Sequence, residues 1–214
     1  METQIILPRK ERERLTRREE ILTAARKVFS ERGFEKATLD EIAEVAEFGK
    51  GTIYNYFKSK EELFTCIIER GINRFQQFVA EAIQNKTTPR KKVETYIDSA
   101  FEFFEKHRQI FSILELERND LARNLNDEMF CKCCEQQAAL LQFLAQLFNE
   151  GIKKGEFKKL DSLKLAQALF GLIHVAYFHA IREPETSNLK KDAKLIKQIF
   201  FEGVAKVSLN NLNR

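Results

Sequence analysis

Three helix-capping boxes punctuate the first part of this 214-residue chain. In a capping box, a Ser or Thr hydroxyl and a carboxylate three residues later satisfy the free backbone N–H groups that open a helix. The boxes are Thr16-x-x-Glu19, Thr38-x-x-Glu41 and Ser59-x-x-Glu62. Apolar residues follow each box at the spacing of one helix face. We therefore predict that helices begin at these boxes, that the first ends at Gly33, and that the third continues to about residue 86.

Composition extends the helical prediction to the whole chain. With 8 glycines and 3 prolines, few tight hairpins can form, and the abundant Lys, Glu, Leu, Ala and Gln favour helices. Further helices are expected over about 89–107, 109–117, 120–153, 162–182 and 188–210. We expect an all-α fold of about nine helices. Its parts would be a basic N-terminal arm (1–15), a three-helix head (16–62) and a larger helical domain (63–214).

Positive charge gathers near the N-terminus. The net charge is only +4, but residues 9–18 (RKERERLTRR) carry six basic and two acidic side chains. A locally basic segment attracts a polyanion and could add a minor-groove or phosphate contact on DNA. A solvated, partly disordered tail is the alternative.

A helix expected over 39–46 and a short helix over 50–57 are separated by a turn of about four residues. This spacing is typical of a helix-turn-helix, in which the second helix enters the major groove of DNA. Thr52 and Asn55 carry short hydrogen-bonding groups suited to base edges. Ile53 and Phe57 would point back into the head. The alternative is that the short helix only packs, with its tyrosines half-buried.

The stretch TLDEIAEVAEFGKGTIYNYFKSKEELF (38–64) resembles the DNA-binding signature of the TetR family of bacterial transcriptional regulators. The resemblance covers residues 17–64 closely, and the remainder only in layout. It implies a dimer on a pseudo-palindromic double-stranded DNA operator. The implied phosphate-contacting, helix-positioning or base-facing residues are Thr38, Lys50, Gly51, Thr52, Tyr54, Asn55, Tyr56 and Lys60. Lys58 is expected to neutralise a phosphate because of its charge alone.

The sequence departs from the family pattern at Glu47 and Gly49, where Gly and Ser are frequent. Glu47 would be strained if the turn requires a positive φ. Gly49 would cap the second helix slightly less well than Ser.

Phenylalanine is common, at 19 residues, and many lie beyond residue 70. Core packing explains most of them. The resemblance implies that others line a cavity for a small, largely apolar or aromatic effector. The candidates are Phe75, Phe78, Phe104, His107, Phe111, Phe130, Cys134, Phe170, His174 and Tyr177.

The last two expected helices carry broad apolar faces. These faces can form the core of the chain itself. By the resemblance, they pair with the same helices of a second copy as a four-helix bundle. The candidate dimer residues are Phe170, Ile173, Tyr177, Ile196, Ile199, Phe200, Gly203 and Val207.

Cys131, Cys133 and Cys134 crowd into the stretch FCKCC. They could sense thiol chemistry or a metal, but their spacing is not that of a known zinc ligand set. Burial as small apolar side chains is the alternative, and we expect no metal and no other cofactor. Three clustered cysteines form no disulfide framework, which favours a reducing compartment.

Other classes of protein find less support. No secretory signal is visible, and Leu165–Ile181 is interrupted by polar residues, so we expect a cytoplasmic protein that does not enter a membrane. We find no paired carboxylates in a plausible cleft, no nucleophile with a histidine and no glycine-rich phosphate loop, so no enzyme is expected. The favoured hypothesis is a repressor released by a ligand. A thiol or metal sensor on the same DNA head, and a helical protein–protein adaptor with a vestigial head, are the alternatives.

Overall fold

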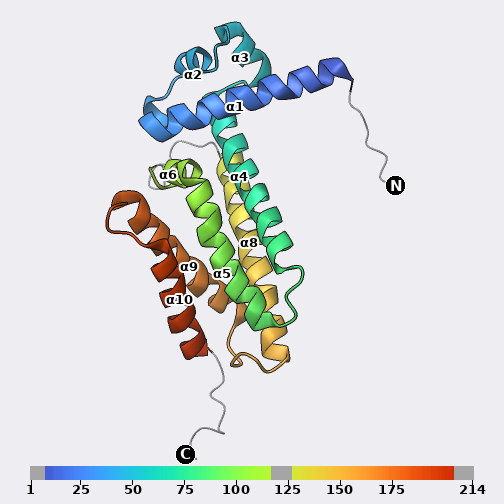
Figure 1. Ribbon diagram of the computed structural model, residues 1–214. Coiled ribbons are helices and arrows are strands. Elements are labelled where there is room, and N and C mark those ends of the chain that lie inside the picture. The colour runs from blue at the N-terminus through green and yellow to red at the C-terminus, as the bar shows by residue number, and fades with distance from the viewer. Residues whose placement is uncertain (1–7, 117–126, 205–214) are drawn as a thin grey trace, which may run out of the picture. The chain divides into compact units, whose positions relative to one another are not determined.

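The computed structural model describes residues 8–116 and 127–204, and within these ranges it contains nine helices and no strand (Figure 1). The all-α prediction is confirmed. The helices are α1 (Arg9–Lys36), α2 (Leu39–Val45), α3 (Lys50–Tyr56), α4 (Lys60–Ile83), α5 (Pro89–Lys106), α6 (Arg108–Leu116), α8 (Asp127–Lys153), α9 (Ser162–Arg182) and α10 (Leu189–Val204).

The chain divides into two compact units, and the division falls inside α4, between Arg70 and Gly71. The first unit, called the head below, also takes in residues 112–131, and the second takes in 71–111 and 132–214. The division lies later than the expected boundary at residue 62. The reason is that the first turns of α4 carry head core residues, including Leu63, Phe64 and Ile67.

Three phenylalanines form the centre of the head. The ring of Phe64 on α4 lies 5.9 Å from that of Phe29 and 5.0 Å from that of Phe34, both in edge-to-face geometry. Such arrangements are favoured between aromatic rings. Ile42 of α2 and Ile53 of α3 are also fully buried, so all four helices contribute to one apolar core.

Helix α1 begins at Arg9 rather than at Thr16, so the prediction from the first capping box is wrong. Thr16 lies within the helix, and its hydroxyl donates to the carbonyl of Arg12 at 3.0 Å. A threonine can form this bond without interrupting a helix. Residues 9–15 are therefore helical, and the i,i+4 ion pair between Arg9 and Glu13 (2.7 Å) supports their helical turns. Gly33 (φ 76°, ψ 166°) ends the regular helix as predicted.

The other two boxes form where they were predicted. At Thr38 the box is complete, because the hydroxyl accepts from the Glu41 N–H and the Glu41 carboxylate accepts from the Thr38 N–H. At Ser59 it is shifted by one residue. The hydroxyl accepts from the Glu62 N–H, but the Glu62 carboxylate accepts from the Lys58 N–H at 2.7 Å.

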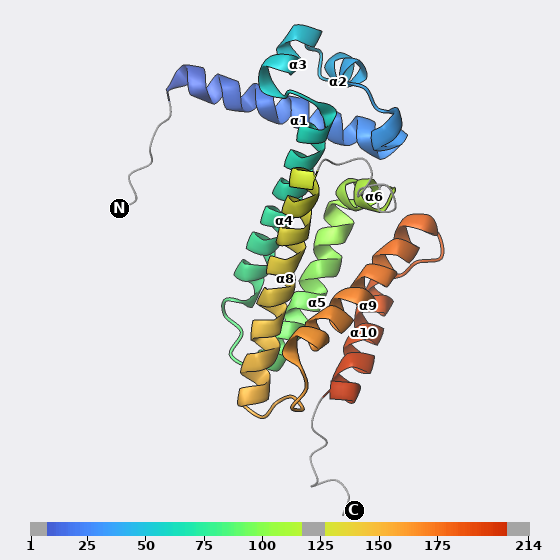
Figure 2. The same ribbon diagram turned by 180° about the vertical axis from the view of Figure 1, so that it is seen from behind.

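In the second unit, α8, α5 and the α9–α10 pair follow one another across the unit, as opposite views show (Figures 1 and 2). They enclose one apolar core together with Val79 and Ile83 from the end of α4. Among the described residues, α9 is the one helix long and apolar enough to cross a bilayer, by length and composition only. Its Leu165, Ala166 and Leu169 are buried in this core.

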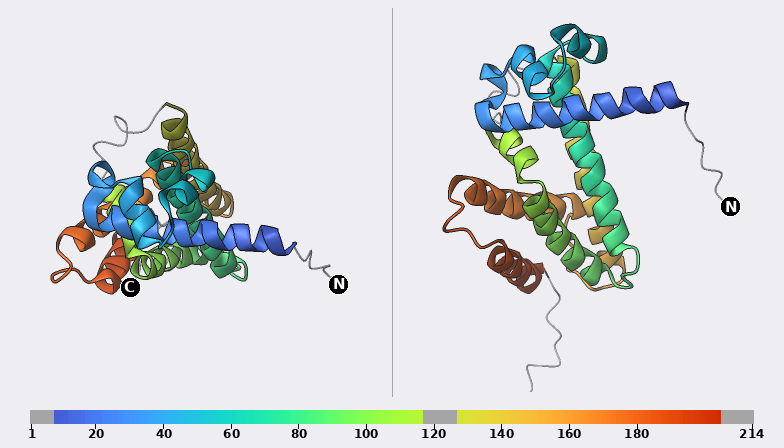
Figure 3. Two further views of the ribbon diagram at one scale, coloured as in Figure 1. Left: turned by 90° about the horizontal axis from the view of Figure 1, so that it is seen from above. Right: turned by 45° about the horizontal axis from the view of Figure 1, so that its top comes forward.

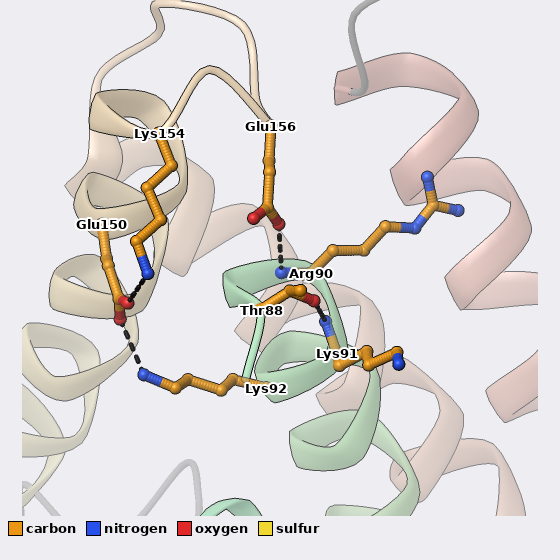
Figure 4. A network of polar contacts seen from close by, with 7 residues as sticks. All are labelled: Thr88, Arg90, Lys91, Lys92, Glu150, Lys154 and Glu156. Carbon is orange, nitrogen blue, oxygen red and sulfur yellow. Dashed lines mark hydrogen bonds and ion pairs between the residues drawn. The ribbon is translucent and has the colours of Figure 1, made fainter. Parts of the chain in front are cut away.

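A polar network joins the start of α5 to the end of α8 (Figure 4). Thr88 caps α5 by accepting from the Lys91 N–H, with Pro89 in the first turn as expected. The Glu156 carboxylate accepts from the Arg90 N–H at 2.9 Å, and Glu150 accepts from both Lys92 (2.9 Å) and Lys154 (2.8 Å). The free N–H groups at the start of α5 therefore have partners from two segments.

Candidate functional site

The turn between α2 and α3 has the geometry of a helix-turn-helix. Helix α2 ends as the Ala46 N–H donates to the Ile42 carbonyl, and Glu47 then adopts φ 57°. The turn does require a positive φ at Glu47, the condition under which we expected strain, and this is an uncommon conformation for a residue with a side chain. Gly49 is the N-cap of α3 (φ −65°, ψ 145°) as expected, with no side chain to cap the helix.

Helix α3 buries one side and exposes the other. Ile53 and Phe57 are buried in the head core, as predicted. Tyr54 is 55% exposed, and a Cβ placed on Gly51 would meet no atom within 4 Å. We call the outward residues the reading face, which consists of Lys50, Gly51, Thr52, Tyr54, Asn55 and Tyr56. Thr52 and Tyr56 are half-buried at its edges, and the others are exposed. The packing-only alternative does not fit the exposure of Tyr54.

Three of the expected DNA contacts also have partners within the head. Lys50 forms an ion pair with Asp40 of α2, and both side chains are more than half exposed. The Lys60 ammonium is not free at the surface, because it donates hydrogen bonds to the carbonyls of Phe34 and Glu35, each at 3.0 Å. Thr38 caps α2. Lys60 and Thr38 therefore position helices, which is one of the two roles that the resemblance implied for them.

Arg18 is a head residue that the sequence did not single out. Its guanidinium lies 4.8 Å from the centre of the Phe57 ring, and one of its nitrogens lies 3.1 Å from the Cys66 sulfur. Arg18 therefore links α1 both to the residue that ends α3 and to α4. Sequence patterns did not indicate this contact, because Arg18 is at the end of a run of charged residues and is not distinguished from its neighbours.

In the second unit, most of the expected effector-binding residues fall in one aromatic cluster. Phe104 stacks on Tyr177 with ring centres 4.5 Å apart and ring planes 7° apart. Phe111 packs against both rings, at 5.0 and 5.1 Å. Phe103 links Phe111 to three further rings, and two more join through Phe75 and Tyr177. The other members are Phe75, Phe78, His107, Tyr96 and Phe101.

Tyr96, Phe101 and Phe103 were missed as candidates. Their signal was present, because they share α5 with Phe104 and His107. Burial raises the pKa of the Tyr96 phenol, and it raises that of Tyr177, with the nearby Tyr96 as a second cause. Both phenols are therefore neutral at physiological pH, and the cluster presents apolar ring surface with uncharged hydroxyls.

The remaining effector candidates do not join this cluster. Phe170 contacts His174 at 5.9 Å between ring centres, as a separate pair on α9. Cys134 is exposed on α8. The side chain of Phe130 lies outside the described residues.

Most of the residues predicted to form a dimer interface face the core of the second unit instead. Ile173, Tyr177, Ile196 and Phe200 are buried in the core of their own unit, so the intramolecular alternative holds for these four. Both helices are apolar on more than one side, and periodicity alone does not tell which side faces the core. Ile199 and Gly203 are exposed and Phe170 is half-buried, whereas Val207 lies outside the described residues.

Both of these helices also carry large apolar side chains that are exposed. These side chains are Leu172 and Val175 on α9, and Leu195 and Ile199 on α10. A Cβ on Gly171 or Gly203 would meet no atom within 4 Å. We refer to these four exposed side chains, Leu172, Val175, Leu195 and Ile199, together as the outer apolar patch.

The burial alternative does not hold for two of the clustered cysteines. Cys131 and Cys134 are exposed, and the side chain of Cys133 is outside the described residues. Within the described part of the chain, no group of three His, Cys, Asp or Glu side chains is placed to hold a metal ion.

A helix-turn-helix head with an exposed reading face, followed by a helical unit with its own core, defines a DNA-binding transcriptional regulator. A sequence profile described as "Bacterial regulatory proteins, tetR family" matches residues 21–67, and one described as "YsiA-like protein, C-terminal region" matches residues 68–203. The chain belongs to the TetR family of bacterial regulatory proteins.

Named relatives have similar sequences or folds. The chain is 30% identical to the fatty acid metabolism regulator protein of Bacillus subtilis over 155 residues, which cover 72% of this chain and 78% of that protein. It is 26% identical to the transcriptional repressor NicS of Pseudomonas putida over 166 residues, 76% of this chain and 74% of that protein. The crystal structure of FadR from Bacillus subtilis in complex with stearoyl-CoA has a TM-score of 0.76 and 26% identity, covering 86% of this chain and 98% of that chain.

Proposed function

We propose that this cytoplasmic protein is a repressor that binds a pseudo-palindromic operator as a dimer and is released when a long-chain acyl-CoA binds its second unit. The reading face of α3 carries the DNA half of the proposal. It presents hydrogen-bonding and positively charged side chains outward while Ile53 and Phe57 anchor the helix. A major groove about 12 Å wide admits one such helix.

We propose that Asn55 and Lys50 face the bases, and that Gly51, which has no side chain, lets the backbone of α3 approach the duplex closely. Thr52, Tyr54 and Tyr56 would contact phosphates or thymine methyl groups. Lys58, which is exposed beyond the end of α3, would contact a phosphate at the rim of the groove. Thr38 and Lys60 would hold the flanking helices at the position that these contacts require.

The aromatic cluster supports the effector half of the proposal. Its rings offer the apolar surface that an acyl chain requires, and its buried phenols are neutral. A relative of the same fold that is 26% identical to this chain binds stearoyl-CoA. The ligand needs to favour the released state by only about 1–3 kcal/mol to lower operator affinity markedly. We expect the acyl chain to contact Phe75, Phe104, Phe111 and Tyr177.

The outer apolar patch supports the dimer. Val175 is 67% exposed, and it shares the patch with three other large apolar side chains. Patches of this kind on a soluble protein mark interaction surfaces. A second copy would bury the patch and supply the second head for a two-fold symmetric operator.

The test measures binding to a labelled duplex that the protein selects from a randomised DNA pool. We expect stearoyl-CoA to weaken binding at least tenfold, whereas free CoA and a short acyl-CoA leave it unchanged. Asn55→Ala should relax the selected sequence, and Glu44→Ala, an exposed change on α2, should not. No selected sequence would refute the DNA half. Equal binding with and without every acyl-CoA would refute the effector half.

A thiol sensor is a second candidate, because Cys131 and Cys134 are exposed one helical turn apart on α8. Solvent access is a requirement for reversible thiol oxidation. If thiols are the sensor, diamide should release the operator from the native protein and not from a variant with Cys131, Cys133 and Cys134 replaced by Ser. Release by stearoyl-CoA in that variant would instead favour the acyl-CoA proposal.

A further inference from the structure

The charged first turns of α1 carry basic residues on the same side of the helix that, farther along, is buried in the head. Ile21, Ala24 and Val28 are buried there at three- and four-residue spacing. At 3.6 residues per turn, such positions lie along one side of a helix. Counting back from Ile21 with the same spacing gives three exposed basic residues, Arg17, Arg14 and Lys10. We call these three residues the basic stripe.

Acidic side chains do not neutralise this stripe. Lys10 and Arg17 form no ion pair with any described residue, and Arg14 lies 3.9 Å from Glu11 in a pair that is largely exposed. Exposed pairs of this kind contribute little. At about 100° per residue, Arg12 lies on the opposite side of the helix from the stripe, and Arg9, which pairs with Glu13, lies about a quarter turn away. The stripe therefore carries three basic side chains with one weak acidic partner.

The basic stripe extends away from the head on a rigid element. The N-terminal part of α1 continues beyond α2 and α3 (Figures 1 and 3). Arg18, the next basic residue, lies against Phe57 at the end of α3 and against Cys66 of α4. The helix is thus held to the head at the point where its exposed part begins.

We propose that the basic stripe binds phosphates of the DNA flank next to the base pairs read by α3. This inference rests on the proposed DNA binding. A helix with side chains is about 10–12 Å across, and the minor groove is about 6 Å wide. Residues 9–18 are helical, so they do not enter the minor groove as an extended arm could. Lys10 to Arg17 span about 10 Å, and a duplex offers one phosphate per strand for about every 3.4 Å along its axis, so the stripe is long enough to meet more than one phosphate.

The experiment measures the salt dependence of binding to a labelled 40-base-pair duplex recovered from a randomised pool by the native protein. The test variant is Lys10→Gln/Arg14→Gln/Arg17→Gln. The matched control is Arg9→Gln/Arg12→Gln/Lys27→Gln, which removes the same charge from exposed positions of α1 that lie at least about a quarter turn away from the stripe. A third variant, Lys10→Arg/Arg14→Lys/Arg17→Lys, keeps the charge. All side chains changed are exposed, and circular dichroism is expected to show unaltered folding.

Each phosphate contact contributes about 0.9 to the slope of log K against log salt concentration. We expect the test variant to lose about 2–3 units of slope, with the selected sequence unchanged. The matched control and the charge-keeping variant should retain the native slope. Equal losses in the test and control variants, or no loss in either, would overturn the proposal. A native protein with no salt-dependent binding would refute the proposed DNA binding itself, which distinguishes the two failures.

Discussion

The ammonium of Lys60 lies 3.0 Å from the carbonyl oxygens of both Phe34 and Glu35, and 4.5 Å from the centre of the Phe34 ring. Carbonyls at the end of a helix have no partner within the helix, and a cation at this end is favourable. A residue at the start of α4 thereby completes the end of α1. This contact fixes the two helices that bracket the helix-turn-helix.

Replacing Lys60 by Met should therefore destabilise the head. The apolar stem would remain, but two charge-assisted hydrogen bonds would be lost, at a net cost of about 1–2 kcal/mol. Urea unfolding monitored by circular dichroism measures this change. Lys58→Met, at an exposed position nearby, is the control. Identical unfolding midpoints for the two variants would contradict the prediction.

Replacing Gly151 by Ala should destabilise the second unit. A Cβ at Gly151 would lie 2.2 and 2.3 Å from ring carbons of Phe157, which is fully buried, and 3.1 Å from Pro89. Overpacking of this kind costs about 1–3 kcal/mol. Gly71→Ala is the comparison, because its Cβ would meet only the Ile110 side chain, at 3.1 Å from Cγ2 and 3.4 Å from Cδ1. Thermal unfolding should show a larger decrease in the unfolding temperature for Gly151→Ala than for Gly71→Ala. A larger decrease for Gly71→Ala would contradict the prediction.

Acid should weaken the polar network at the start of α5. Hydrogen bonds from Lys154 and Lys92 lower the pKa of Glu150. A carboxyl with a lowered folded-state pKa contributes stability above its unfolded pKa, and the contribution is lost as pH falls through the folded value. Native protein should be more stable than Glu150→Gln at pH 7, and the difference should shrink on acidification toward pH 3. A difference in urea midpoint that is independent of pH would rule out this role.

Charge placed in the outer apolar patch should disrupt the proposed dimer without unfolding the chain. Val175 is 67% and Ile199 53% exposed, so glutamate at both positions contacts solvent in the single chain. Sedimentation should detect a monomer with unchanged helicity. Leu160→Glu, at another half-exposed apolar position (50%), should leave the native mass unaltered. A dimer that persists in Val175→Glu/Ile199→Glu would place the interface elsewhere.

The sequence predicted the head well because its signals are local. The capping residues Thr38 and Ser59 act on N–H groups within three residues, and Gly33 supplies a φ that few other residues adopt. Thr16 misled for a related reason. Its hydroxyl can either cap a helix or bond to a carbonyl one turn back, and because residues 9–15 are already helical it forms the second bond, to Arg12.

The second unit was predicted less completely because burial there depends on distant segments. Ile196 and Ile199 have the same chemistry on one helix, yet one is buried and the other is exposed. The difference is set by packing against residues far along the chain, which periodicity does not report. The same applies to Cys131 and Cys134, whose small apolar side chains suggested burial, although they are exposed.

Helix α4 runs without interruption through the boundary between the two units. A chimera that joins this head to the effector unit of another regulator would therefore have no flexible linker at which to place the junction. The junction would have to fall inside a helix and keep its phase, since one added residue turns everything downstream by about 100°. Chimeras joined with insertions of whole turns should retain regulation, and those joined out of phase should bind DNA without responding. Insertions and deletions in α4 are thus constrained by helical register, as well as by the identity of its side chains.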